Sequence, residues 1–463
     1  MQSVRDGERF DLIVAGGGNA ALCAALAALE NSEKVLLLEK APAYLRAGNT
    51  RHTRDIRYAH DVDRNTSGPY KAEELTSDIL RVTGGETNMR LTKMLVEESQ
   101  DVPDWMEKHG AILRREIRGT LHLGRSNAFF LGGGKAVANT YYETIVRRKG
   151  RVLYESAVED VLLDGAVARG VVARVGGKRI SLESDAVVVA CGGFESNLDW
   201  LRKIWGDTVD NFIIRGTRYN DGELLSALLG KGAMPIGNPK QAHMAAVDAR
   251  SPKFDGGIVT RVDSIPFGIV VNKLGRRFYD EGEEEWPKRY AIWGKLIAEQ
   301  PDQIAYSIFD TRVRGRFLPP AFPPYRAATL EDLARQLDLD FQALSDTIRE
   351  YNHHTRSDAS PDYRVLDECS TSGLDPPKSH WATQLTQAPY FGYALRPGLT
   401  FTYMGLAVDE KARVLRSGGE PFRNLYAAGE IMAGNILGKG YLGGLGLTIG
   451  TVFGRKAGVS SSE

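Results

Sequence analysis

The sequence has few cysteines, no surplus of charge and no long apolar run. Three cysteines among 463 residues, Cys23, Cys191 and Cys369, form no Cys-x-x-Cys pair, which excludes a disulfide scaffold and a self-contained four-cysteine Fe–S cluster. The 59 Lys and Arg residues balance 59 Asp and Glu residues, which argues against a sequence-independent nucleic-acid binder. No apolar run is long enough to predict a transmembrane helix, and the charged N-terminus lacks the core of a signal peptide. We expect a cytoplasmic globular protein.

Glycine is in excess, with 50 residues of 463, and one glycine cluster has the setting of a dinucleotide site. Gly16 and Gly18 follow a short apolar run that suits a buried parallel strand, and Ala21 lies in a segment rich in helix formers. A second apolar run ends at Glu39, about 20 residues on, as the Rossmann fingerprint requires. Gly16 would permit the tight turn, Gly18 would let the backbone approach a pyrophosphate, and Glu39 would bind ribose hydroxyls.

The order of elements predicts an α/β protein whose nucleotide domain is interrupted. Residues 151–190 have strand composition, with turn signals between the strands. Within 238–402 prolines are frequent and the βαβ rhythm is lost, with 329–355 as the best helix. We therefore predict a discontinuous Rossmann-like domain, 1–237 and 403–463, with an inserted α+β capping domain, 238–402. The alternative is a loop-rich continuation of a single domain.

The far end of the chain favours FAD over NAD as the dinucleotide. A strand-like segment ends at Gly429 and Glu430, and Gly444 and Leu445 open the last predicted helix. A second nucleotide contact so remote in sequence suits a long, extended cofactor lying between both ends of the chain. A helix N-terminus beside the flavin pyrimidine would stabilise the anionic reduced ring. On spacing alone, Glu430 could also be an ordinary surface carboxylate.

Stretches along nearly the whole chain match known sequence motifs. They are GGGNAALCAALAA (16–28), AGNTRHTRDIRYAHD (47–61), GGGKAVANTYY (132–142), VACGGFESN (189–197), NDG (220–222), QAHMAAVD (241–248), VNKLGRRFYDE (271–281), EWPKRYAIWGK (285–295) and LYAAGEIMAGNILGKGYLGG (425–444). Together they resemble the flavoproteins of fumarate reductases and succinate dehydrogenases, whose 3-oxosteroid dehydrogenase relatives share the FAD motifs. The stretches 47–61 and 285–295 resemble most specifically the branch of FAD-dependent tricarballylate dehydrogenases.

The resemblance implies an FAD-binding domain with the capping domain closing over the flavin. Besides the residues named above, it assigns these to the cofactor: Asn19, Ala20, Lys40, Asn49, Thr50, Gly133, Gly134, Ala157, Val158, Gly192 and Asp221. In succinate dehydrogenases a histidine near this first loop holds FAD covalently, and Asn49 occupies that place here. The resemblance therefore implies non-covalent, dissociable FAD. His52, three residues on, leaves a covalent link open.

Cationic residues in the two most specific stretches indicate a polycarboxylate substrate. Arg51 and Arg54 belong to a cationic run in the first loop, and Lys288 lies in the second stretch. Arginine suits this role because it can bind a carboxylate through two parallel hydrogen bonds. By resemblance, His243 would bind a substrate carboxylate, and Thr260 is a further candidate for such a contact. The other interpretation of the arginine run is a solvated, salt-bridged surface face.

The proton-transfer group is less determined than the cofactor site. By resemblance, Arg289 occupies the place of the arginine that shuttles the proton, although a pKa above 12 makes arginine an unusual acid or base. Tyr403 and Tyr441 are rival candidates, and they stand where fumarate reductases place a carboxylate-binding histidine and arginine. The relay residues of those enzymes would fall on Arg261 and Ser264. These departures argue against plain fumarate or succinate chemistry.

The resemblance implies a dehydrogenase of CH–CH groups that passes a hydride to flavin N5, with tricarballylate oxidised to cis-aconitate as the expected reaction. The alternatives are a fumarate reductase-like or steroid-type flavoenzyme and a non-catalytic flavin-binding subunit. Because no cysteine cluster carries electrons onward, we expect a separate acceptor: a membrane-bound Fe–S protein, a quinone or oxygen. A membrane-bound acceptor would bring this otherwise cytoplasmic protein to the inner face of the membrane.

Overall fold

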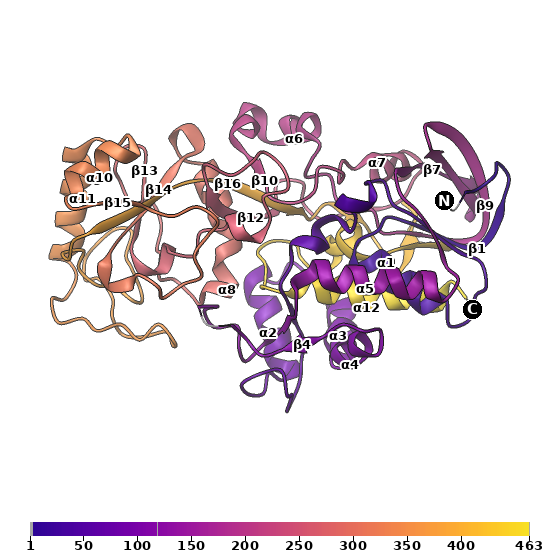
Figure 1. Ribbon diagram of the computed structural model, residues 1–463, viewed down its shortest axis with the longest axis horizontal. Coiled ribbons are helices and arrows are strands. Elements are labelled where there is room, and N and C mark those ends of the chain that lie inside the picture. Colours follow the sequence, from indigo (N-terminus) through magenta and orange to yellow (C-terminus); the bar gives the residue numbers. More distant parts are fainter. Residues whose placement is uncertain (1–2, 118, 463) are drawn as a thin grey trace.

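A mixed sheet of eight strands forms one end of the molecule, where the N- and C-termini also lie (Figure 1). The computed structural model describes residues 3–117 and 119–462. Strands β19, β9, β1, β2 and β6 pair in parallel in that order, and β18 adds an antiparallel edge. Their bounds are Arg9–Ala15 (β1), Val35–Leu38 (β2), Arg151–Leu153 (β6), Lys178–Val189 (β9), Arg413–Leu415 (β18) and Pro421–Ala427 (β19).

The parallel strands are apolar because helices and loops cover both of their faces. All four residues of β2, Val35–Leu38, are buried. The predicted βαβ start of the chain is confirmed: the helix α1, Asn19–Ala28, follows β1 and is buried along its whole length. It packs against the C-terminal helix α12, Leu445–Ser460, and against α5, Gly133–Arg147 (Figure 1).

Two glycines of α12 let it approach the backbone of α1. A Cβ atom at Gly454 would lie 2.5 Å from the carbonyl oxygen of Ala20, and one at Gly458 would clash with that of Ala24. We expect Gly454→Ala to lower the free energy of unfolding by about 1–3 kcal/mol, the usual cost of overpacking a filled core. Chemical denaturation measures this. Gly230→Ala, where a Cβ has no neighbour within 4 Å, is the control and should not destabilise; an equal loss in both variants would contradict the packing argument.

The expected hairpins of 151–190 are confirmed as an antiparallel meander. Strands β7, Ser156–Asp164, and β8, Val167–Val175, pair with each other, and β8 pairs with the first half of β9. The tight turns fall at Gly165 and Gly176, both with positive φ, as the turn signals require. The long strand β9 thus links the meander to the parallel sheet.

The other end of the molecule contains a second sheet built around one long strand, β16, Tyr390–Thr402 (Figure 1). Strands β12, β14 and β15 pair with β16 in antiparallel fashion, β10 pairs with it in parallel, and β13 pairs with β14. The bounds are Ile213–Ile214 (β10), Ala242–Asp248 (β12), Ile269–Asn272 (β13), Ala305–Asp310 (β14) and Tyr325–Ala327 (β15).

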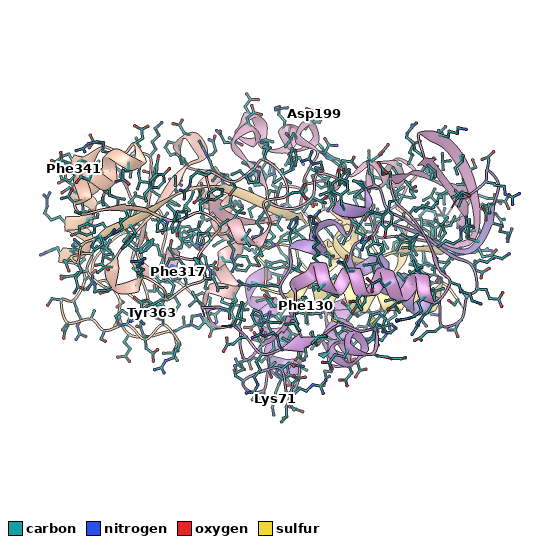
Figure 2. All side chains as sticks on the ribbon, in the orientation of Figure 1. Lys71, Phe130, Asp199, Phe317, Phe341 and Tyr363 are labelled. Atoms are coloured by element: carbon teal, nitrogen blue, oxygen red, sulfur yellow. The ribbon has the colours of Figure 1, made fainter. Side chains whose placement is uncertain are left out.

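Two helices, not one, occupy the segment 329–355. They are α10, Leu330–Leu337, and α11, Phe341–His353. The chain turns at Asp338, whose φ of +55° ends the first helix, and the side chain of Asp340 caps the second. Both helices pack on the outer end of the second sheet, where Phe341 projects to the surface (Figure 2).

The chain passes between the two sheets more than once. Strand β10 joins the second sheet although it precedes the expected boundary at 237, and a two-stranded ribbon of β11, Pro235–Ile236, and β17, Gly405–Leu406, lies close to both expected boundaries. The division into domains at these positions therefore stays a prediction. What the topology does establish is that residues from both sheets can reach one shared space.

A small sheet and the remaining helices complete the fold. The sheet has the order β3-β5-β4. The bounds are Asp55–Arg57 (β3), Leu113–Arg114 (β4), Asn127–Phe130 (β5), Ala72–Thr83 (α2), Met89–Ser99 (α3), Val102–Lys108 (α4), Leu198–Trp205 (α6), Glu223–Gly230 (α7), Trp286–Arg289 (α8) and Trp293–Ala298 (α9). Within the described residues, no helix is both long and apolar enough to cross a membrane.

Candidate active site

One cavity lies at the carboxyl ends of the parallel strands and extends to the second sheet. This position is where open α/β sheets bind ligands. Residues that follow β1, β2, β9 and β19 line one part of it, and residues of β12, β16 and the segments near α8 and α12 line the other. The cofactor candidates predicted from the sequence that line this cavity are Gly16, Gly18, Asn19, Ala20, Glu39, Lys40, Asn49, Thr50, Val158, Gly192, Asp221, Gly429, Glu430 and Gly444.

Three glycines, Gly16 to Gly18, follow β1, and a side chain would meet different surroundings at each of them. Gly16 has a φ of +119°, and a Cβ there would clash with the carbonyl oxygen of Ala190 at the end of β9. A Cβ at Gly17 would clash with the Glu39 carboxylate. At Gly18, by contrast, a Cβ would meet no protein atom closer than 3.4 Å. The protein itself therefore requires Gly16 and Gly17, while Gly18 leaves open space on the cavity side, as a backbone that a pyrophosphate approaches would need.

Glu39 is fixed at the end of β2 by backbone donors. Its Oε1 accepts from the Ala41 N–H at 2.8 Å, and its Oε2 accepts from the Ala47 N–H at 3.2 Å. The side chain is 5% exposed, and this burial raises the pKa of Glu39 despite those hydrogen bonds. A carboxylate held in this way can still accept further hydrogen bonds from sugar hydroxyls in the cavity.

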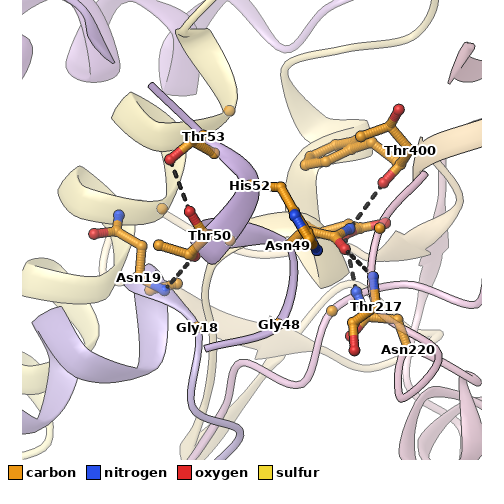
Figure 3. A pocket seen from close by; sticks show the side chains of 18 of the residues that line it. Gly18, Asn19, Gly48, Asn49, Thr50, His52, Thr53, Thr217, Asn220 and Thr400 are labelled. Atoms are coloured by element: carbon orange, nitrogen blue, oxygen red, sulfur yellow. Dashed lines mark hydrogen bonds between the residues drawn. The ribbon is translucent and has the colours of Figure 1, made fainter. Parts of the chain in front are cut away.

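Asn49 joins three parts of the chain across the cavity (Figure 3). Its Nδ2 donates to the Thr400 carbonyl at 2.8 Å and to Glu195 Oε1 at 2.7 Å, and its Oδ1 accepts from the Thr217 N–H at 2.8 Å. A neutral amide engaged on both sides has no nucleophilic atom to offer. His52 also lines the cavity, with Nε2 3.5 Å from Asp255 Oδ1. Non-covalent attachment of FAD therefore stays a prediction.

Glu430 is buried, so the surface-carboxylate interpretation of this residue is wrong. It is 9% exposed, and its Oε1 accepts from the Thr402 N–H at 2.9 Å. Nearby, Lys40 forms an ion pair with Asp221 at 2.5 Å at the more open end of the cavity. The structure thus places Glu430 and the Lys40–Asp221 pair at different depths of the same cavity.

The far end of the cavity is cationic and aromatic. Arg54, Arg215 and Arg261 line it together with side chains that include His243, Tyr290, Tyr441, Trp286 and Phe401. Arg261 is neutralised by Asp263 through hydrogen bonds of 2.7 and 2.8 Å. Arg54 has a weaker partner, with its Nε 3.2 Å from Asp55 Oδ2.

Arg215 has no such partner. Its side chain is buried at 6% exposure, and Nη1 contacts no hydrogen-bonding atom among the described residues. Burial lowers the pKa of Arg215 to about 10, since it opposes the charged form. At neutral pH the guanidinium nevertheless remains a cation. A buried, uncompensated charge is costly, so this end of the cavity is suited to an anion.

His243 and Tyr441 lie face to face in the same region. Their ring centres are 4.1 Å apart, and the Tyr441 hydroxyl accepts from the Gly446 N–H at 3.0 Å. Burial, reinforced by the charges of Arg215 and Arg261, lowers the pKa of His243 well below its usual value. The imidazole is therefore neutral, and its Nε2 is without a partner among the described atoms. Burial raises the pKa of Tyr441, so the phenol keeps its proton.

The structure does not bring every sequence-predicted residue to the cavity lining. Lys288 binds Asp78 at 2.9 Å, and Arg289 binds Glu283 at 2.8 Å. The hydroxyl of Tyr403 donates to the Gly440 carbonyl. Four cofactor candidates and two substrate candidates are also outside the lining: Gly133, Gly134, Ala157, Leu445, Arg51 and Thr260.

Some of these outlying residues support the wall of the cavity instead. The Gly134 N–H donates to the Thr53 carbonyl at 2.8 Å, and a Cβ on Gly134 would clash with the Thr50 carbonyl. The start of α5 therefore holds the loop that carries Asn49 and Thr50. Thr260 Oγ1 donates to the Gly257 carbonyl at 2.8 Å. Sequence reasoning missed Arg215, which lies in a loop that matches no recognised motif.

The model of the family described as FAD binding domain matches residues 11–447. An NADH:fumarate oxidoreductase from Klebsiella pneumoniae (strain 342) is 26% identical over 98% of this chain and 48% of its own length. An NADH:acrylate oxidoreductase from Vibrio harveyi is also 26% identical, over 98% of this chain and 50% of its own length. The chain thus spans about half the length of these two curated relatives.

Solved structures share the fold along nearly the entire chain. The open conformation of a flavocytochrome c3 fumarate reductase superposes with a TM-score of 0.77, at 21% identity, over 99% of this chain and 78% of the other. A 3-ketosteroid-Δ4-(5α)-dehydrogenase from Rhodococcus jostii RHA1 gives a TM-score of 0.74, at 21% identity, over 99% of this chain and 98% of the other. The expected α/β flavoprotein fold is confirmed.

Proposed function

The chain belongs to the FAD binding domain family, and from this premise we propose that it is a flavoenzyme that moves a hydride between a C–C bond of a carboxylate substrate and FAD. One observation carries the proposal: the buried, unpartnered guanidinium of Arg215 faces the cavity that the FAD motifs also line. A carboxylate supplies the planar pair of oxygens that a guanidinium binds best.

The charges around Arg215 support an anionic substrate over a neutral one. Asp263 already compensates Arg261, and Asp55 partly compensates Arg54. Neutral His243 adds no charge but can form a hydrogen bond through its free Nε2. This leaves Arg215 as the main carboxylate anchor, with Arg54 as a second cation for a further carboxylate group.

The chain's own residues must also exchange a proton with the substrate, since FAD when bound supplies only the hydride chemistry. Among the three sequence candidates, Tyr441 lines the cavity, and we assign the proton transfer to its hydroxyl. The protonated phenol suits donation to a substrate carbon in the reductive direction. In the oxidative direction the hydroxyl would first have to give up its own proton, so that the phenolate accepts the proton from the substrate carbon. The roles of Arg289 and Tyr403 stay predictions.

Tricarballylate, oxidised to cis-aconitate, is the substrate that we propose to test first. Its support is the resemblance of two loops together with the cations Arg54, Arg215 and Arg261 on the cavity wall. A fumarate reductase-like reaction on another unsaturated carboxylate fits the cavity equally well. The aromatic wall formed by residues such as Tyr290 and Phe401 would also suit the neutral substrate of a steroid-type enzyme, but that candidate leaves Arg215 without a partner.

Anaerobic flavin spectroscopy distinguishes these candidates. Tricarballylate and succinate are added to the oxidised holoprotein, and cis-aconitate, fumarate and acrylate to the photoreduced holoprotein, with a 3-oxosteroid as the neutral comparison. We expect a carboxylate, and not the steroid, to change the redox state of the flavin. A response to the steroid alone would contradict the anion site. A flavin that photoreduces but responds to no compound would favour the non-catalytic subunit.

The electron partner is a separate proposal. Cys23, Cys191 and Cys369 are free cysteines in the structure, and within the described residues no group of three or more His, Cys, Asp or Glu side chains could hold a metal ion. We propose a separate acceptor or donor: a membrane-bound Fe–S protein, a quinone or oxygen. A stopped-flow comparison of reduced-flavin oxidation by oxygen and by a soluble quinone measures which is used; equal, very slow rates with both would favour a protein partner.

A further inference from the structure

Two buried glutamates meet in the wall of the cavity, and only one of them was expected there. Glu195 is 0% exposed and follows β9, whereas Glu430 follows β19 and faces the cavity. A Cβ on Gly193 would lie 2.9 Å from Glu195 Oε2 and would clash with Glu430 Oε1. The two carboxyl groups therefore approach each other in a space that exists only because residue 193 is glycine.

The same two amides serve both glutamates. Asn49 Nδ2 and Asn220 Nδ2 each lie 2.7 Å from Glu195 Oε1 and 3.5 Å from Glu430 Oε2. Glu195 Oε2 accepts no hydrogen bond from a donor among the described atoms. No lysine or arginine of the described chain forms an ion pair with either carboxyl group. Two buried carboxyl groups that share the same amide donors, with neutral donors only, disfavour ionisation of both.

We propose that Glu195 and Glu430 share one proton at neutral pH, so that Glu430 faces the cofactor cavity as an uncharged carboxylic acid and Glu195 acts as its positioning residue. Glu195 is the ionised member because its Oε1 accepts two amide hydrogen bonds of 2.7 Å, which favour the charged form. Glu430 accepts one backbone hydrogen bond as short as 2.9 Å, from the Thr402 N–H. Because Glu430 is uncharged in this arrangement, it does not present a negative charge to a cavity whose cofactor is itself an anion. The arrangement also gives Glu430 a donor hydrogen, which a carboxylate lacks.

Electrostatics agree with this geometry. Burial raises the pKa of Glu430, and the negative charge of Glu195 raises it further. Burial also raises the pKa of Glu195, while hydrogen bonds from Glu430, Asn220 and Asn49 oppose that rise. The other titratable groups facing the pair keep their protons at neutral pH: burial raises the pKa of Cys191 to about 12.

Tyr403, another titratable neighbour of Glu430, also stays neutral, because burial raises the pKa of its phenol well above the usual value. A protonation signal from this region at pH 8 would therefore come from the glutamate pair. The pair also makes folding stability depend on pH. Because its pKa is raised in the folded state, the folded state binds more protons than the unfolded state. The pair therefore contributes its full stabilisation at pH values below the pKa that these glutamates have in the unfolded chain. This stabilisation is lost as the pH rises through their raised pKa in the folded protein.

Infrared spectroscopy of the holoprotein in H2O and D2O, with 13C-labelled glutamate, tests the proposal directly. At pH 8 we expect the wild type to have a carboxylic-acid C=O band that is missing from Glu430→Gln and that loses at least half of its intensity in Glu195→Gln. The last change follows because Glu430 loses the neighbouring charge. A structural role of Glu195 without proton sharing would leave the band unchanged.

Glu284→Gln is the matched control, since Glu284 is another buried glutamate, at 4% exposure, outside the pair. Its band should equal that of the wild type. The proposal is overturned if the wild type has no carboxylic-acid band at pH 8, or if the band in Glu195→Gln is as strong as in the wild type. Because the measurement needs no substrate turnover, either result is independent of the reaction proposed above.

Discussion

Replacement of Arg215 by methionine should lower kcat/KM for the carboxylate substrate by about 10²–10⁴. The guanidinium can form two charged hydrogen bonds to a carboxylate, each worth about 1.5–3 kcal/mol, and each 1.4 kcal/mol corresponds to a factor of ten. The same change should raise the Tm of the substrate-free protein, because it removes a buried cation that has no partner among the described residues. A loss of function joined to a gain in stability is the signature of a residue kept for binding.

Steady-state kinetics and differential scanning calorimetry measure the two effects. Arg218→Met is the control: its side chain is 57% exposed and does not line the cavity, so both kcat/KM and Tm should stay near the wild-type values. FAD content should be unchanged in both variants. An Arg215→Met enzyme with kcat/KM within tenfold of the wild type would contradict the assignment of the anion site.

Gly17→Ala should reduce FAD affinity at least a hundredfold. The new methyl group would clash with Glu39 Oε2 and with the Tyr142 hydroxyl, which donates to the Gly17 carbonyl at 2.8 Å. Glu39 cannot simply turn aside, because two backbone N–H groups hold its carboxylate. The substitution therefore disturbs the residue that is placed for the ribose and narrows the turn before the pyrophosphate position.

The FAD dissociation constant of the apoprotein, measured by quenching of flavin fluorescence, tests this expectation. Gly230→Ala, which adds a methyl group to α7 with no atom within 4 Å, should bind FAD like the wild type. The Tm of each apoprotein separates a local effect on the cofactor from unfolding. Full, tight FAD occupancy in Gly17→Ala would show that the cofactor lies elsewhere.

The sequence predicts the cofactor end of the site well because short-range rules govern it. A strand, a glycine turn and a helix follow one another within residues 10–28, and backbone geometry alone brings Gly16 and Glu39 to the same edge of the sheet. The packing of α12 on α1 was not part of that pattern. It depends on glycines of α12, such as Gly454, that match no motif.

The cationic end of the cavity, where we propose that the substrate binds, is harder to predict from the sequence. Its charge depends on which arginines and lysines form ion pairs in the folded protein. Lys288 and Arg289 lie in a motif-like stretch, but the structure pairs Lys288 with Asp78 and Glu285 and pairs Arg289 with Glu283. Asp78 is remote in sequence, and the nearby glutamates are part of a charged run that does not itself show which charges pair. Arg215 carries no motif, yet it is left unpaired at the cavity. His243 and Tyr441 were both named from resemblance, and only the fold shows that their rings stack.

The central claim is hydride exchange between a carboxylate substrate and the flavin, and an anaerobic product count tests it most directly. Oxidised holoprotein is mixed with excess tricarballylate, the loss of the flavin band is recorded, and the organic product is quantified. The account predicts one equivalent of cis-aconitate for each flavin reduced, or, for an unsaturated carboxylate mixed with reduced holoprotein, one equivalent of saturated product for each flavin oxidised. A flavin that dithionite reduces but that no carboxylate reduces or oxidises would contradict it.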